Sequence, residues 1–187
     1  MKKTILLTIL MLSLVALSAK DMIVKTLDNG MEVVVKKNTS NQSVGLFCFV
    51  KTGSIHEGKY LGTGISHYLE HIVSGGSTKL HSEEYYGKKE KEIGSMTNAH
   101  TTYDKTAFHM QVSKQYFSEA LKMLSEHMMY CSFDTTEVSR EKQVIAKEIV
   151  MRSTPPYSQM QQGCYEKIYA NSHERYPVIG YVEQFLK

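Results

Sequence analysis

The sequence has few cysteines and an odd number of them, which argues against a fold stabilised by disulfide bonds. It has three, Cys48, Cys131 and Cys164, whereas an exported domain built on disulfides normally has an even number. The sequence leaves undecided whether Cys131 and Cys164 form a disulfide bond. None of the three cysteines is predicted to be catalytic. Cys48 lies in the apolar run LFCFV and is interpreted as a small core residue.

The sequence also lacks an excess of charge, an internal repeat and any low-complexity segment. Its 22 lysines and arginines stand against 19 aspartates and glutamates, and removing Lys2 and Lys3 from that count leaves 20 against 19. The cluster KKEKE at 88–92 alternates in sign, which is typical of a solvated helix face. No basic stripe is present, so nucleic acid is not an expected partner.

The first 19 residues have the pattern of a secretory signal peptide. Two lysines precede an apolar run from Ile5 to Leu17, and small residues follow, so cleavage is predicted after Ser18 or Ala19. A membrane anchor is the alternative, but the run is short for a spanning helix. We therefore expect export to the bacterial periplasm or the medium, with no stable membrane anchor after cleavage.

Residues 20–187 are the predicted domain, in which strand and helix patterns follow each other at short intervals. A hairpin is expected over 22–37 because Asn29-Gly30 suits a tight turn. Further strands are predicted over 44–52 and, in two runs, over 96–112. Helices are predicted over 64–73, 83–93, 114–130, 135–152 and 156–170.

This order of elements predicts an α+β fold, with a mostly antiparallel sheet and helices packed on one face. The segment VEQFLK at 182–187 starts another helical pattern and stops there. We therefore expect the domain to be incomplete at its C-terminal end.

The stretch GISHYLEHIV at 64–73 combines charged and apolar residues in an unusual way. On a helix, His67, Glu70 and His71 share one face because residues three and four apart are neighbours. Two imidazoles so placed can bind one zinc ion, and the glutamate can take a proton from metal-bound water, whose pKa zinc lowers to about 7. The alternative is a chance cluster of surface residues, and a catalytic zinc site needs a third protein ligand.

The candidate for that third ligand lies in the segment EKQVIAKEIV. Glu141 and Glu148 are seven residues apart, so they lie on one helix face together with Val144 and Ile145. A carboxylate among core residues is paired or bound to a metal, because isolated burial of its charge is costly. A solvent-facing glutamate on an amphipathic helix is the alternative, and spacing alone favours it.

Taken together, these segments resemble the pitrilysin/insulinase family of zinc metallopeptidases, in which H-x-x-E-H inverts the commoner zinc motif. The resemblance implies that His67 and His71 bind one zinc ion per chain and that Glu70 is the general base. The family's third ligand is a glutamate about 77 residues past the second histidine, which matches Glu148. Glu141 matches a preceding glutamate and is expected to support catalysis by orienting a ligand or the helix.

Other segments extend the resemblance over nearly all of the chain after the leader: TLDNGMEVVV, VKTGSIHEG, GSMTNAHTTYDKTAFHMQV and HERYPVIGYVEQF. It implies a LuxS/MPP-like half-domain in which Asn98 and Ala99 bind the backbone of a peptide added as a strand. It also implies a second homologous domain or subunit that closes a chamber. Ser74 and His100 depart from aromatic positions of the family, and the role of His100 stays open.

The expected function is a zinc-dependent endopeptidase domain that hydrolyses peptides or unfolded polypeptide segments with zinc-activated water. One alternative is a non-catalytic half-chamber that binds peptide or completes a two-chain protease. Another is a zinc-binding protein without hydrolysis.

Overall fold

The computed structural model describes residues 22–187. The predicted signal peptide, residues 1–19, therefore lies outside the described residues. The described residues fall into two compact units, which meet between residues 42 and 43 of the sequence, and each is described by itself. No helix within residues 22–187 is both long enough and apolar enough to cross a bilayer.

The described part of the first unit is the predicted hairpin. Strands β1 (Met22–Thr26) and β2 (Glu32–Lys36) pair antiparallel. Gly30 has a φ of 82°, and the side-chain oxygen of Asn29 accepts a hydrogen bond from the backbone N–H of Met31 at 3.1 Å. Glycine adopts this backbone conformation without steric cost. The predicted hairpin is confirmed, and of the Asn-Gly pair only Gly30 has a positive φ.

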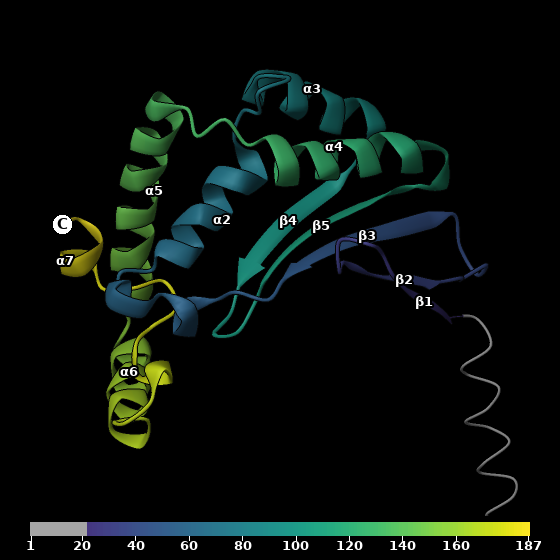
Figure 1. Cartoon of the computed structure of the whole chain (residues 1–187). Helices are drawn as coiled ribbons and strands as arrows, with labels where there is room; N and C mark the ends of the chain where they lie inside the picture. Colours follow the sequence, from purple (N-terminus) through teal and green to yellow (C-terminus); the bar gives the residue numbers. More distant parts are fainter. Residues whose placement is uncertain (1–21) are drawn as a thin grey trace, which may run out of the picture. The chain divides into compact units, whose positions relative to one another are not determined.

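The second unit is built on a three-stranded antiparallel sheet (Figure 1). Its strands are β3 (Ser43–Val50), β4 (Met96–Thr101) and β5 (Thr106–Ser113), in the spatial order β3-β5-β4. Strand β4 is consequently an edge strand in the part of the chain that the structure describes. One side of it bonds to β5, and its other backbone edge faces away from the sheet.

Helices make up most of the remainder of this unit: α2 (Ile65–Gly75), α3 (Glu83–Ile93), α4 (Phe117–Tyr130), α5 (Thr135–Ser153), α6 (Pro156–Ile168) and α7 (Val182–Phe185). Each predicted helix is found: α3 has the predicted ends, and the other predicted helices have at least one end shifted by one to three residues. The largest shift is at the start of α4, where residues 114–116 form a 3-10 turn. Such tighter turns are frequent at helix ends.

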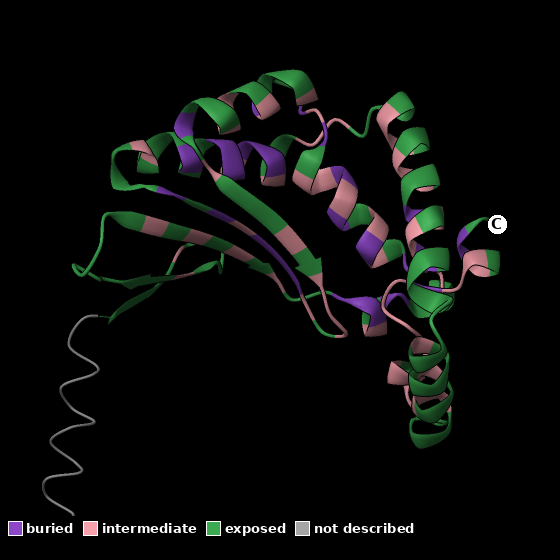
Figure 2. Ribbon diagram, turned by 180° about the vertical axis from the view of Figure 1, so that it is seen from behind, coloured by how far each residue is buried: buried purple, intermediate pink, exposed green. Residues whose placement is uncertain are grey.

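The main core lies between one face of the sheet and the helices α3 and α4. Phe108 and Met110 of β5 pack there with Tyr86 of α3 and Met123 of α4. The opposite face of the sheet carries exposed aromatic residues, and Phe47 and Phe49 on β3 are 60% and 59% exposed. Figure 2 shows the buried positions on the helix-covered side. The predicted α+β arrangement, with helices on one face, is confirmed.

A second, smaller core joins α2, α5 and α7. Ile145 and Ile149 of α5 are buried with Phe185 of α7, and Tyr68 of α2 packs against them. The rings of Tyr68 and Phe185 meet edge to face at 5.3 Å. This cluster holds α5 against α2, the two helices that carry the predicted metal ligands.

The three cysteines are all free, so the possible bridge between Cys131 and Cys164 does not form. Cys48 is half-buried and packs against the main core, as its apolar neighbours predict. Apolar packing, and not disulfide bonding, holds this unit together.

Candidate metal centre

Helix α2 begins at Gly64, where a close contact with a distant segment of the chain leaves no room for a side chain. Gly64 has a φ of 72°, and a Cβ placed on it would lie 2.1 Å from the carbonyl oxygen of Ile179. In the first turn of α2, the backbone N–H of Ser66 donates a hydrogen bond to the buried carboxylate of Glu57 at 2.9 Å. Both contacts determine where the helix starts, and therefore which of its side chains face the interior.

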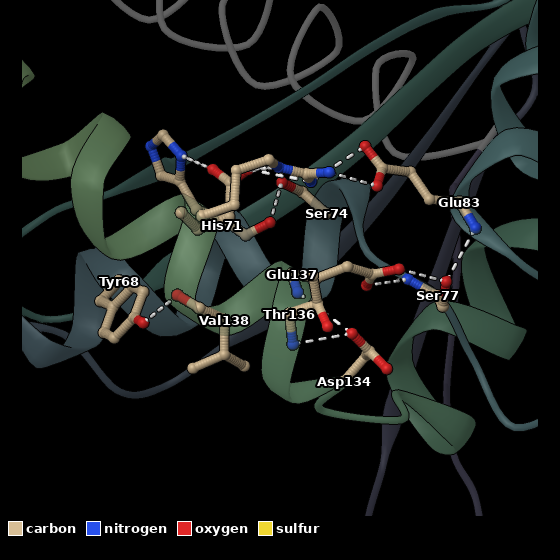
Figure 3. Close-up of polar contacts among 11 residues, drawn as sticks. Tyr68, His71, Ser74, Ser77, Glu83, Asp134, Thr136, Glu137 and Val138 are labelled. Carbon is tan, nitrogen blue, oxygen red and sulfur yellow. Dashed lines mark hydrogen bonds and ion pairs between the residues drawn. The ribbon is translucent and has the colours of Figure 1, made fainter.

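Helix α5 is attached to α2 and to the loop after it through polar contacts at its first turns (Figure 3). The side chain of Asp134 caps α5 by accepting hydrogen bonds from the N–H groups of Thr136 and Glu137. Glu137 in turn accepts a hydrogen bond from the N–H of Ser77 at 2.7 Å. The hydroxyl of Tyr68 donates to the carbonyl of Val138 at 2.5 Å.

This packing brings one carboxylate of α5 to both imidazoles of α2. Glu148 Oε2 lies 3.5 Å from His71 Nε2 and 3.9 Å from His67 Nε2. One ligand atom from each of the three residues lies within 4.8 Å of the others. The Glu148 side chain is only 16% exposed, so the alternative of a solvent-facing glutamate does not hold.

The donor set suits zinc. In a tetrahedral site with metal–ligand distances of about 2.0–2.2 Å, neighbouring ligand atoms are about 3.3–3.5 Å apart. The two distances from Glu148 are close to that spacing. Two imidazole nitrogens and one carboxylate oxygen also match catalytic zinc sites, which keep a fourth position for water or substrate.

Burial keeps His67 neutral, as a metal ligand has to be. Desolvation, with a smaller contribution from His71, lowers the pKa of His67 to about 4. An uncharged imidazole offers its lone pair to a metal without first losing a proton. The rings of His67 and His71 meet edge to face with centroids 4.7 Å apart.

Glu70 lies on the same face of α2 and is 6% exposed. Its Oε2 accepts a hydrogen bond from the hydroxyl of Thr101 on β4 at 2.6 Å. Burial raises the pKa of Glu70, and the hydrogen bond from Thr101 counteracts part of that increase. The result is a carboxylate that is held in place and is more basic than one in water.

Glu141 contacts the candidate metal centre through the ring of His71. Its Oε2 lies 3.3 Å from His71 Nδ1, while Nε2 of that ring faces Glu148. A carboxylate on the far nitrogen of a metal-binding histidine fixes its tautomer and orientation. Glu141 is not part of the group of possible metal ligands.

Asn98 and Ala99 lie on edge strand β4, three and two residues before Thr101. Asn98 is exposed and Ala99 half-buried, and the N–H of Ala99 donates to Asn98 Oδ1 at 2.9 Å. His100 is exposed, with its ring 6.4 Å from that of His109. It is not one of the possible metal ligands among the described residues.

Comparison with known proteins assigns the family. The sequence model of the insulinase family, peptidase family M16, matches residues 32–180. The chain belongs to this family. The match takes in α2 and α5 and therefore every residue of the candidate centre.

Individual relatives agree with this assignment. A Bacillus subtilis (strain 168) protein named "Uncharacterized zinc protease YmxG" is 30% identical over 155 residues, which are 83% of this chain and 37% of that protein. A crystal structure of a Helicobacter pylori protease superposes with a TM-score of 0.82 at 25% identity, covering 89% of this chain and 40% of the other.

The first half of the Escherichia coli periplasmic protease PqqL has the same fold. It superposes with a TM-score of 0.78 at 24% identity, over 90% of this chain and 37% of that one. The chain thus spans about two fifths of the length of these relatives. Relatives of this insulinase-family chain in Bacillus subtilis and Rickettsia felis are named zinc proteases.

Three polar partners of the insulinase-family centre were not found by sequence reasoning: Thr101, Arg140 and Arg152. Arg140 donates to Glu141 Oε1 at 3.1 Å and forms two hydrogen bonds with Glu83 of α3 (Figure 3 labels Glu83 and His71). Arg152 pairs with Glu148 Oε1 at 2.6 Å. The four-residue spacing of Glu148 and Arg152 was the one available signal. The roles of Thr101 and of Arg140, which links Glu141 to Glu83, required the tertiary structure.

Proposed function

We propose that this chain is the catalytic half of an exported zinc-dependent endopeptidase that acts on peptides or unfolded polypeptide segments. One observation carries the proposal. Two imidazoles from α2 converge with one carboxylate from α5, 77 residues after the second histidine, beside the buried carboxylate of Glu70. Such a centre combines a metal-binding set with a separate proton acceptor.

His67, His71 and Glu148 would hold the metal. Zinc, when bound, supplies a Lewis acid that makes water nucleophilic at neutral pH. These three residues offer one ligand atom each, which is the protein ligand number of catalytic zinc sites. Glu141 keeps the imidazole of His71 oriented through its Nδ1.

Glu70 acts as the general base. Thr101 holds one of its oxygens, Oε2, and the other takes the proton of the attacking water. The raised pKa of Glu70 makes that transfer more favourable than it would be for an exposed glutamate. The protonated side chain then returns the proton to the leaving amine as the peptide bond breaks.

The edge of β4 supports binding of the substrate as an extended strand. An added strand bonds through backbone groups, so it is recognised with little dependence on sequence. Asn98 and Ala99 lie on this edge strand, in the part of the sheet beside α2. Their assigned role is to hold the peptide backbone while the scissile bond reaches Glu70.

A second homologous domain or subunit would close the chamber around the peptide. The chain spans 37% of its relative in Bacillus subtilis and 40% of the Helicobacter pylori protease. We therefore expect weak or no peptidase activity from the 187-residue chain alone. Export to the periplasm or medium rests on the signal-peptide pattern of residues 1–19.

The variant Glu70→Gln tests the proposal because the amide is isosteric but accepts no proton at neutral pH. We expect it to retain zinc at the wild-type level and to lose at least about 100-fold in peptide cleavage, the lower range for general-base catalysis. Zinc content is measured by elemental analysis. Cleavage is measured with a quenched fluorescent peptide after the second half is supplied. Glu84→Gln, an exposed glutamate of α3, is the control.

Two results would contradict the proposal. Cleavage by Glu70→Gln at the wild-type rate would show that Glu70 is not the general base. Zinc bound with no cleavage by the wild-type assembly would instead support a peptide-binding half-chamber.

A further inference from the structure

The two glutamates that α5 directs at the metal centre share a pattern. Glu148 turns Oε2 toward the imidazoles, while Arg152 pairs with its Oε1 at 2.6 Å. Glu141 turns Oε2 toward His71, while Arg140 donates to its Oε1 at 3.1 Å. In both cases an arginine of the same helix binds the oxygen that points away from the histidines.

This division of oxygens has a consequence for a metal ligand. An ionised carboxylate has two equivalent oxygens and can bind a metal through one or both. A guanidinium on Oε1 of Glu148 opposes rotation of the carboxylate and competes for that oxygen. Only Oε2 then faces the imidazoles, and one coordination position stays open for water or substrate, as catalytic zinc sites require.

We propose that Arg152 is a positioning residue that holds Glu148 as a one-oxygen zinc ligand. The inference rests on the proposed function, in which Glu148 binds zinc. Arg152 itself touches neither metal nor substrate in this assignment. It acts through the carboxylate, so its removal changes metal affinity and coordination.

Arg152 is better placed for this role than Arg140. Arg140 is anchored twice, by Glu141 and by the two hydrogen bonds of Glu83 on α3. Glu148 is the one ion-pair partner of Arg152 among residues 22–187. Loss of Arg152 therefore releases a single oxygen of the third ligand and breaks no second ion pair.

A purely structural role is the competing explanation. Arg152 lies in the last turn of α5, where a cation favours the helix, and it follows Glu148 by four residues. Its side chain is 62% exposed, against 16% for Glu148. A helix-stabilising role predicts a change in the unfolding temperature, whereas the positioning role predicts a change in zinc affinity.

The experiment measures zinc affinity of the whole chain by competition with a chromophoric chelator. For Arg152→Gln we expect a dissociation constant about 10–100-fold higher than wild type, the range found when a partner of a metal ligand is removed. Arg152→Met should weaken binding similarly, since it also removes the charge. Arg152→Lys keeps an ion pair and should recover most of the affinity.

Lys147→Gln is the matched control, because it removes one positive charge from the same helix at an exposed residue next to Glu148 in sequence. We expect its zinc affinity to match wild type. Unfolding temperatures of the zinc-free proteins are measured in parallel and should agree among all variants. In the Co²⁺-substituted protein, Arg152→Gln should weaken the visible absorption bands as the carboxylate becomes bidentate and the coordination number rises.

Three results would overturn the inference. The first is a zinc affinity of Arg152→Gln equal to that of wild type. The second is a zinc affinity of Lys147→Gln that is reduced as much as that of Arg152→Gln. The third is a loss of zinc affinity that is accompanied, in both Arg152→Gln and Arg152→Met, by a lowered unfolding temperature of the zinc-free protein. Glu148→Gln separates this failure from failure of the proposed function, because that variant must lose zinc if Glu148 is a ligand at all.

Discussion

At the residue scale, burial shifts the pKa values of His67 and Glu70 of α2 in the directions that metal binding and proton transfer require. Desolvation lowers the pKa of His67 to about 4 and raises the pKa of Glu70. The imidazole is therefore neutral at pH 7, and the carboxylate is a stronger base than usual. Thr101 limits the second effect, since its hydroxyl stabilises the ionised form of Glu70.

Thr101→Val should make this contribution measurable. The variant keeps the branched shape but removes the donor to Glu70 Oε2, so the ionised form loses a bond to a charged group, about 1.5–3 kcal/mol. The pKa of Glu70 then rises further, and the acidic limb of the kcat/KM profile moves to higher pH. Thr97→Val, on the same strand with its hydroxyl paired to Ser95, is the control.

The measurement is the pH dependence of peptide cleavage in the assembled peptidase, with zinc content determined at each pH. An acidic limb at the wild-type position in Thr101→Val would show that this hydrogen bond does not tune Glu70.

At the element scale, the start of α2 is the most constrained point of the site. Gly64 combines a left-handed φ with an approach of 2.1 Å between its missing Cβ and the carbonyl oxygen of Ile179. The same helix is then held by Glu57 at its first turn and by Tyr68 at its middle. These contacts explain why the histidines face α5, which the apolar pattern of α2 alone did not require.

Gly64→Ala should therefore destabilise the fold strongly. A left-handed non-glycine residue costs about 1–2 kcal/mol by itself, and the clash with the Ile179 carbonyl adds to it. We expect a loss of at least about 2 kcal/mol in the free energy of unfolding. Gly87→Ala in α3 is the contrasting variant, because a Cβ there meets nothing within 4 Å.

Both variants are compared with wild type by urea unfolding of the zinc-free chain. In Gly87→Ala we expect a gain of about 0.5–1 kcal/mol, since alanine is favoured over glycine inside a helix. A Gly64→Ala protein as stable as wild type would contradict the structural account of this helix start.

At the scale of the whole molecule, stability in acid depends on groups buried in neutral form. His127 of α4 is 8% exposed, and its ring lies 4.2 Å from that of Tyr86. Burial lowers the pKa of His127 below its ordinary value of 6.5. The unfolded chain therefore binds a proton that the folded chain excludes, and stability falls as the pH drops below about 6.5.

His127→Gln should flatten this dependence. Between pH 6.5 and the lowered pKa, the wild-type free energy of unfolding decreases by up to about 1.4 kcal/mol per pH unit for this one proton. The variant lacks that contribution, although it is less stable at pH 7 because a packed ring is lost. Unfolding curves of the zinc-free proteins from pH 7.5 to pH 5 give the two slopes.

His173→Gln, an exposed histidine, serves as the control for the loss of a titrating side chain. An identical slope for wild type and His127→Gln would show that His127 does not contribute to acid sensitivity.

The sequence by itself determined the elements and the residue types of the site. The hairpin at Asn29-Gly30, the α+β order and the helical spacing of His67 and His71 all follow from local rules of turn chemistry and periodicity. Local spacing also put Glu141 and Glu148 on one helix face. It favoured a solvent-facing Glu148, because a sequence does not show which face of a helix meets which neighbour.

The family resemblance predicted the opposite orientation for Glu148, and the tertiary structure shows the physical reason for it. Packing of Ile145 and Ile149 against Tyr68 turns the glutamate face of α5 toward α2, so that Oε2 of Glu148 comes within 3.9 Å of both imidazoles. The contact of Thr101 with Glu70 likewise depends on a strand lying beside a helix. Contacts between segments distant in sequence arise from burial of apolar surface, which has no local signature in the residues that it brings together.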